Sequence, residues 1–93
     1  LPSDFATSIY PNPFNPSTTV AYDLPSEASV SIVIYDALGQ EVRRLVSDTK
    51  SAGRYTIQWD ARDNLGRGVG SGVYIAKVEA GAFSATQKML LLK

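Results

Sequence analysis

The 93-residue sequence predicts an all-β domain, folded as an antiparallel β-sandwich of six or seven strands. Three observations support this class. Apolar and β-branched residues alternate with polar residues at a period of two along several segments. Turn-forming residues recur about every 8–12 residues, and no stretch has the 3.6-residue periodicity of an amphipathic helix. A small closed barrel is the alternative that these patterns leave open.

The first half of the chain is expected to supply three strands, or four if residues 5–10 pair with a neighbour. Residues 11–16 contain three prolines, which exclude a helix because proline lacks a backbone N–H and pushes the preceding residue toward extended geometry. Strands are predicted over residues 17–24 and 29–35. Residues 40–46 break the alternation, so we expect a bulged or short edge strand there.

The second half is expected to supply three further strands. Residues 47–53 are polar and predict a loop, and residues 54–60 have the clearest strand pattern. A long glycine-rich loop is predicted over residues 61–72. Strands over residues 73–79 and 83–92 are then joined by a tight hairpin turn.

The composition excludes several classes of protein. Nine basic residues balance nine acidic ones, whereas a domain that binds nucleic acid usually carries a basic excess. Cysteine and histidine are absent, so there is no disulfide, no thiolate and no imidazole base or metal ligand. No apolar run approaches the roughly 18–20 residues of a membrane-spanning helix. Because the chain begins at Leu1 without methionine or a signal-peptide pattern, we expect it to be part of a larger protein.

The acidic residues form no recognisable catalytic pattern. Asp60, Asp63 and Asn64 place oxygen atoms near Gly66 and are weak candidates for a calcium site. The turn-forming chemistry of Asp and Asn side chains explains the same residues equally well. The glycine-rich run 66–72 departs from phosphate-binding patterns and leads into a strand, not a helix. We therefore expect no catalytic residue and no cofactor.

Six aromatic residues are the remaining candidates for ligand contacts, because exposed rings in a row stack on sugars. They are Tyr10, Tyr22, Tyr35, Tyr55, Trp59 and Tyr74. Tyr55 and Trp59 share a predicted face with Ile57, which is the pattern of a stripe that faces the core. Burial is therefore favoured, and Tyr10 and Tyr35 are the two whose position stays open.

The chain ends in an apolar run between two lysines. One interpretation of residues 88–93 is a central strand that is buried on both faces. Another is a terminal tag that a partner must contact, with Lys88 and Lys93 as its charged ends. The two interpretations are compatible with each other.

Five short motifs follow one another along the chain. The first comprises Tyr10, Pro11, Asn12, Pro13, Phe14, Asn15 and Pro16 with the polar residues 17–19. The others are residues 33–42, Gly53 with Trp59 and Asp60, residues 71–74, and the run Lys88, Met89, Leu90, Leu91, Leu92 and Lys93. In this order they resemble the C-terminal sorting domains of the type IX secretion system of the Bacteroidetes lineage. Residues 59–74 also resemble the Ig-like domain of flagellar hook-capping proteins.

The resemblance implies an Ig-like β-sandwich of about seven strands. It also implies a non-enzymatic secretion address on a bacterial cargo protein, which passes through the periplasm and the outer membrane to the cell surface or the medium. The implied partners are the type IX translocon, its sorting and attachment machinery, and the parent cargo domain, with no nucleic acid and no membrane insertion. Residues 1–9 are then a linker or first edge strand from the parent protein, and residues 10–93 are the sorting domain.

By position, the resemblance assigns partner recognition to residues 88–93 and to the turn glycine Gly72. Because an exposed sheet edge can accept a further strand, we expect the partner to pair with the last strand or its neighbour. Deletion of residues 88–93 is then expected to leave the cargo in the periplasm. The alternative functions are a carbohydrate-binding or spacer module of a secreted glycosidase or protease, and an assembly domain of the hook-capping type.

Overall fold

The computed structural model describes residues 1–93 and contains seven strands and no helix. The strands are β1 (Ala6–Tyr10), β2 (Thr18–Leu24), β3 (Ala28–Asp36), β4 (Glu41–Lys50), β5 (Gly53–Trp59), β6 (Gly72–Ala80) and β7 (Phe83–Leu91). No segment therefore forms a helix of the kind that could span a membrane.

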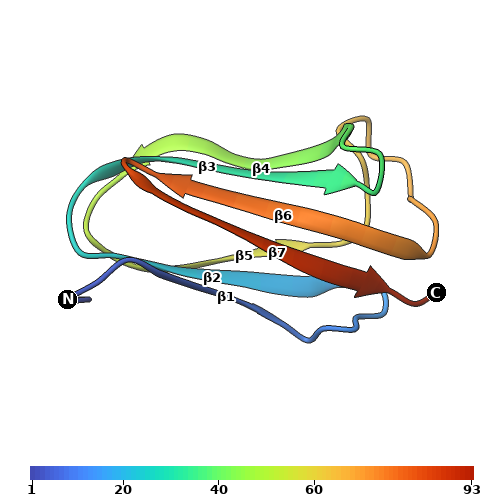
Figure 1. The fold of residues 1–93 in the computed structure, drawn as a ribbon, viewed down its shortest axis with the longest axis horizontal. Helices are drawn as coiled ribbons and strands as arrows, with labels where there is room; N and C mark the ends of the chain where they lie inside the picture. Colours follow the sequence, from blue (N-terminus) through green and yellow to red (C-terminus); the bar gives the residue numbers. More distant parts are fainter.

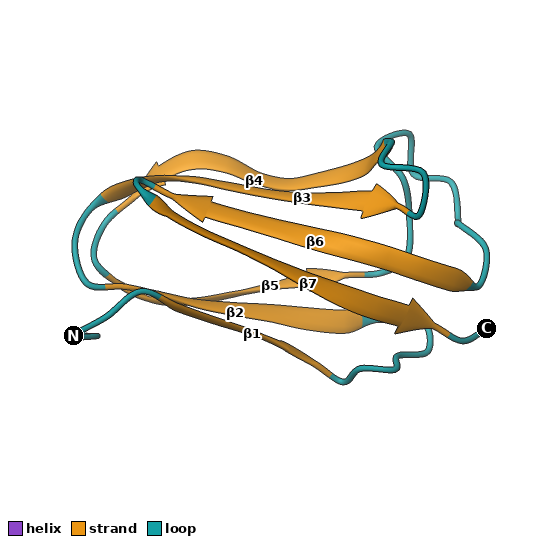
Figure 2. Cartoon of the chain, in the orientation of Figure 1, coloured by secondary structure: helices purple, strands orange, loops and turns teal.

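The strands form two facing antiparallel sheets. One sheet has three strands in the order β1-β2-β5, and the other has four in the order β4-β3-β6-β7. Figures 1 and 2 show the two sheets as separate layers with loops at both ends. The predicted all-β sandwich is confirmed, and the closed barrel is excluded because no strand pairing joins the two sheets into a ring.

The core lies between the sheets and follows the predicted alternation. Val30, Ile32 and Ile34 of β3 point into it and are at most 1% exposed, as expected from their period of two. Seventeen buried residues form one cluster: Ile9, Phe14, Val20, Tyr22, Leu24, Ala28, Val30, Ile32, Ile34, Trp59, Ala61, Tyr74, Ala76, Val78, Ala80, Met89 and Leu91. Phe14 is the member that comes from the proline-rich segment, so this segment is part of the folded unit.

Strand β4 is longer than the sequence predicts. The polar loop predicted over residues 47–53 is wrong, because residues 47–50 pair with residues 28–31 of β3. Polar side chains are tolerated there because β4 is an edge strand and its outer face lies in water. The predicted irregularity is confirmed by register shifts at Ile32/Val33 and Ile34/Tyr35.

Strand β7 lies at the edge of the four-stranded sheet, so the interpretation of residues 88–93 as a central strand is wrong. Its side chains alternate: Met89 and Leu91 are fully buried, whereas Leu90 and Leu92 are 37% and 49% exposed. The apolar run therefore serves two surfaces at once, and only one of them is the core.

Candidate recognition surface around the C-terminal strand

The proline-rich segment between β1 and β2 crosses from one sheet to the other. It leaves β1 at Tyr10 and comes to lie along the outer edge of β7, where Phe14 and Leu91 form a parallel bridge. Figure 1 shows this segment in blue beneath the arrowhead of β7. The first and last motifs of the sequence are therefore in contact.

Four hydrogen bonds fasten this segment to the edge of β7. The Asn12 Nδ2 donates to the Lys88 carbonyl at 2.9 Å, and the Leu90 N–H donates to Asn12 Oδ1 at 3.1 Å. The Phe14 N–H donates to the Leu90 carbonyl, and the Leu92 N–H donates to the Phe14 carbonyl, both at 2.9 Å. The Asn12 side chain and the Phe14 backbone thus act together as a short added strand.

The other residues of the first motif divide between structural and exposed positions. The Phe14 ring is 2% exposed and packs against Trp59 with 5.6 Å between ring centroids. The Pro11 carbonyl accepts a hydrogen bond from Thr18 Oγ1 at 2.8 Å, which fixes the return of the chain into β2. Tyr10 and Asn15 are exposed, as are Pro11, Pro13 and Pro16. The contacts of this motif that reach β7 come from Asn12 and Phe14.

The closing run is divided in the same way. Lys88, Leu90, Leu92 and Lys93 are exposed, whereas Met89 and Leu91 belong to the core. The final residue is also fastened, because the Lys93 N–H donates to Ser71 Oγ at 2.9 Å. A truncation of residues 88–93 would consequently remove core packing together with the exposed side chains.

Gly72 lies where the loop enters β6, opposite Leu91 of β7. Its φ of +152° is one that residues with a side chain rarely adopt, and no atom lies within 4 Å of the position of an added Cβ. Glycine is therefore required here by the backbone conformation, since the space around it is open.

The outer face of the four-stranded sheet carries an apolar row that we name the outer stripe. It comprises Val33 and Tyr35 of β3, Val73 and Ile75 of β6, and Leu90 of β7. Tyr35 lies opposite Ile75, and Val73 lies opposite Leu90, so their side chains share one face. In the sequence, this stripe shows as a failure to alternate with polar residues over residues 33–35, 73–76 and 89–92.

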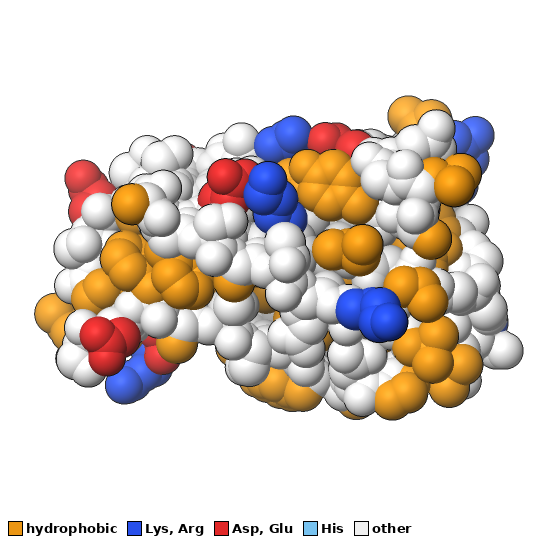
Figure 3. Space-filling view, in the orientation of Figure 1, with side chains coloured by type: hydrophobic (Ala, Val, Ile, Leu, Met, Phe, Trp, Pro, Cys, Tyr) orange, Lys and Arg blue, Asp and Glu red, His pale blue; other side chains and the backbone are white.

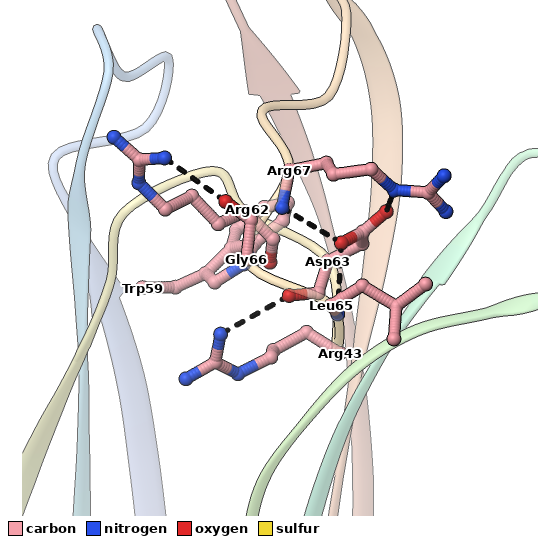
Figure 4. A network of polar contacts seen from close by, with 7 residues as sticks. All are labelled: Arg43, Trp59, Arg62, Asp63, Leu65, Gly66 and Arg67. Atoms are coloured by element: carbon pink, nitrogen blue, oxygen red, sulfur yellow. Dashed lines mark hydrogen bonds and ion pairs between the residues drawn. The ribbon is translucent and has the colours of Figure 1, made fainter.

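The loop between β5 and β6 is held by Asp63 (Figure 4). Its Oδ1 accepts hydrogen bonds from the Arg67 and Leu65 N–H groups, each at 2.9 Å, and its Oδ2 pairs with Arg67 Nε at 3.2 Å. The hydrogen bond from the Arg67 N–H is the largest cause that holds the pKa of Asp63 below its ordinary value. Desolvation comes second and opposes it, and the Leu65 N–H and the Arg67 guanidinium lower the pKa further. Trp59 Nε1 donates to the Arg62 carbonyl at 3.0 Å, which joins this loop to the core.

The weak calcium candidates use their oxygen atoms for the protein's own contacts. Asp63 caps its loop, and Asp60 pairs with Arg62 at 3.5 Å. Asn64 Oδ1 accepts from the Arg44 N–H at 2.9 Å, and its Nδ2 donates to Glu41 Oε2 at 3.0 Å. No three acidic residues gather in the manner of a metal site.

The aromatic residues do not form an exposed row. Trp59, Tyr22 and Tyr74 are buried, and Tyr55 stacks on Tyr22 with 5.2 Å between centroids. Burial, and next the neighbouring Tyr55, raises the pKa of Tyr22; burial, and next Asp36, does the same for Tyr74. Tyr35 is half-buried in the outer stripe, and Tyr10 stands alone at 52% exposed.

The molecule has one hollow, a shallow depression of about 120 Å³ lined by Ala6, Thr7, Ser8, Ala21 and Asp23. Pockets that enclose a small-molecule ligand typically measure about 300–1,000 Å³. The depression is therefore too small to enclose a substrate, and the surfaces available for recognition are sheet edges and faces.

The comparisons with known proteins agree with this architecture. A family model of the FlgD Ig-like domain matches residues 12–83. No curated protein matches the chain. The matched range includes Asn12 and Phe14 and ends at the start of β7, so the terminal run lies outside it.

Three solved structures share the fold. PorZ of Porphyromonas gingivalis, described as an essential bacterial surface component of the type-IX secretion system, has a TM-score of 0.63 and 23% identity over 94% of this chain and 11% of its own. Latent PorU of the same organism, described as dimeric, has a TM-score of 0.73 and 21% identity over 92% of this chain and 9% of its own. FlgD of P. aeruginosa has a TM-score of 0.60 and 24% identity over 80% of this chain and 58% of its own. The chain thus corresponds to one domain of PorZ and PorU, about a tenth of their length.

Proposed function

This chain belongs to the FlgD Ig-like domain family, and from that premise we propose that it is a non-catalytic sorting domain. It directs a cargo protein to which it is attached across the bacterial outer membrane by way of the type IX secretion system. Its partners are the translocon and the sorting and attachment machinery of that system. It acts at the cell surface after passage of the cargo through the periplasm.

The observation that carries the proposal is the contact between the first and the last motif. Asn12 and Phe14 hold the edge of β7 through four hydrogen bonds, although 76 residues separate Asn12 from Lys88. Binding of a partner to a strand costs less free energy when the strand is already ordered and exposed. This clamp orders β7 and leaves Lys88, Leu90 and Leu92 on the surface.

Two further observations support the proposal. The similar structures include PorZ and PorU, and the first of these is described as a component of the type IX system. The chain also lacks the groups that most enzymes use: it has no histidine or cysteine, and its one hollow measures about 120 Å³. Recognition of another macromolecule by a sheet surface fits these features better than catalysis does.

A fusion experiment tests the proposal. The chain is fused behind a periplasmic signal peptide and a reporter enzyme, and the fusion is expressed in a bacterium that has a type IX system and in a mutant without its translocon. We expect the reporter on the cell surface or in the medium of the first strain and in the periplasm of the second. The FlgD Ig-like domain of P. aeruginosa, fused in the same way, is the matched control for the fold alone.

An assembly role of the hook-capping type is the second candidate, because the matching family model is that of FlgD. The same experiment separates the two functions. Export of the reporter by this chain and not by the FlgD domain supports a sorting address. Retention of both fusions in the periplasm contradicts the sorting function and leaves assembly as the better interpretation.

A further inference from the structure

The edge of β7 is closed along the terminal run. The Lys88 and Leu90 carbonyls and the Leu90 and Leu92 N–H groups are all bonded to Asn12 or Phe14. A partner strand that pairs with this part of the edge would have to displace both residues. Farther along β7, the backbone N–H and C=O groups of Ser84 and Thr86 face the same edge, and no other segment forms hydrogen bonds with them.

The outer face of the same run is open. Residues 88, 90 and 92 point to this face because their neighbours Met89 and Leu91 point into the core. Leu90 lies opposite Val73 of β6, and Lys88 lies opposite Ile75. The exposed terminal side chains are therefore continuous with the outer stripe. Figure 3 shows hydrophobic side chains gathering over the half of this sheet where β3 and β7 end and β6 begins.

Val33 marks the far end of the outer stripe. It is 3% exposed and yet is not a member of the core cluster between the sheets. It lies opposite Arg44 of β4 and Lys77 of β6, whose long aliphatic stems can cover it. The outer face of an antiparallel sheet is ordinarily polar where it meets water, so this face is unusually apolar.

The charges around the stripe are unbalanced at one end. Of the nine basic side chains, seven contact a carboxylate, a carbonyl oxygen or an aromatic ring: Arg43, Arg44, Lys50, Arg54, Arg62, Arg67 and Lys77. The side chains of Lys88 and Lys93 have no such contact. Lys88 precedes the exposed leucines of the terminal run and Lys93 follows them. The uncompensated positive charge therefore lies beside the β7 end of the stripe.

We propose that the outer stripe docks a segment of a partner protein that presents apolar side chains to Val73, Ile75 and Leu90 and a carboxylate to Lys88. The inference rests on the proposed function and names the partner chemistry of the same address. An anionic membrane is the less suitable occupant, because lipid recognition typically uses clusters of about 4–8 basic residues. Here two unpaired lysines are available and the formal net charge is zero.

Four variants of the reporter fusion test the proposal. Leu90→Ser removes the apolar contact and Lys88→Glu reverses the charge, and each is expected to lower the exported fraction by about fivefold or more, which corresponds to roughly 1 kcal/mol of docking free energy. Lys88→Arg keeps the charge and is expected to be exported normally. Leu38→Ser is the matched control, because Leu38 is 85% exposed on the turn between β3 and β4 and is not a member of the outer stripe.

A fifth variant distinguishes the face from the edge. Thr86→Pro removes an outward N–H on the open part of the β7 edge, a place where an edge strand accepts proline. Docking on the face predicts normal export of this variant, whereas strand addition predicts its loss. Circular dichroism melting of each isolated variant confirms that it folds, and if Leu90→Ser does not fold, the comparison of Lys88→Glu with Lys88→Arg decides.

The outcomes separate the inference from the function on which it rests. Failure of the wild-type fusion to be exported contradicts the proposed function. Export of the wild type together with equal export of Leu90→Ser and Lys88→Glu overturns the docking proposal alone. Flotation of the isolated domain with vesicles of anionic phospholipid, abolished by Lys88→Glu, would also overturn it, in favour of a membrane.

Discussion

Replacement of Asn12 by alanine tests the clamp on the terminal strand. The change removes the bond from Asn12 Nδ2 to the Lys88 carbonyl and the bond from the Leu90 N–H to Asn12 Oδ1. It leaves the Phe14 backbone in place. Each intramolecular hydrogen bond contributes about 0.5–1.5 kcal/mol to the free energy of unfolding. Because both bonds lie at an exposed edge, we expect a loss of about 1–2 kcal/mol in total.

Two measurements check this expectation. Urea unfolding gives the change in free energy, and a loss of this size lowers Tm by about 4–8 °C per kcal/mol in a domain of this length. Amide hydrogen exchange followed by NMR gives the location: the Leu90 amide is expected to lose its protection, while amides of the central strand β3 keep theirs. Asn15→Ala is the matched control, since the Asn15 side chain is exposed and has no hydrogen bond.

The expected result for Asn15→Ala is a change within about 0.5 kcal/mol, as for most surface substitutions. If Asn12→Ala is equally silent and the Leu90 amide stays protected, the clamp is not what orders β7. A uniform loss of protection across both sheets would likewise contradict a local role of Asn12.

Three further predictions concern the core, the loop and the entry to β6. Phe14→Ala is expected to lower the free energy of unfolding by about 3–5 kcal/mol in urea titrations, because it empties a buried site beside Trp59. The lowered pKa of Asp63 means that its contribution to stability is present above the unfolded pKa of about 3.9 and is lost as the pH falls through the lower folded value. Asp63→Ala should accordingly flatten the dependence of Tm on pH in this acidic range; an unchanged slope would refute the assignment. Gly72→Ala is expected to destabilise by about 1–3 kcal/mol because of its positive φ, whereas Gly70→Ala should be nearly neutral in the same thermal melts.

Local patterns in the sequence were sufficient to predict most of the strands. Strands β2 and β3 were predicted because a buried face imposes strict alternation of apolar and polar residues. The strand over residues 47–50 was missed because an edge strand with a solvated outer face carries no apolar signal. The edge position of β7 was missed for a related reason: its terminal leucines are apolar on both faces, and a buried central strand has the same pattern.

The site was less predictable than the fold. The contact between Asn12 and Lys88 joins residues that are 76 positions apart in the chain, and no pattern in the sequence near either residue predicts it. The outer stripe is assembled from three strands whose register decides which side chains meet, so its members could not be grouped before the sheet order was known. The assignment of partner recognition to residues 88–93 and Gly72 stays a prediction. Because Met89 and Leu91 are buried in the core, the side chains of that run that a partner can contact are the exposed ones.

The most direct test of the sorting function is the fraction of the reporter that protease can reach, measured on intact cells together with their medium. With the wild-type chain attached, we expect most of the reporter to be accessible when the type IX translocon is present, and protected in the periplasm when the translocon is absent. Equal accessibility in the two strains, or equal protection, would contradict the sorting function.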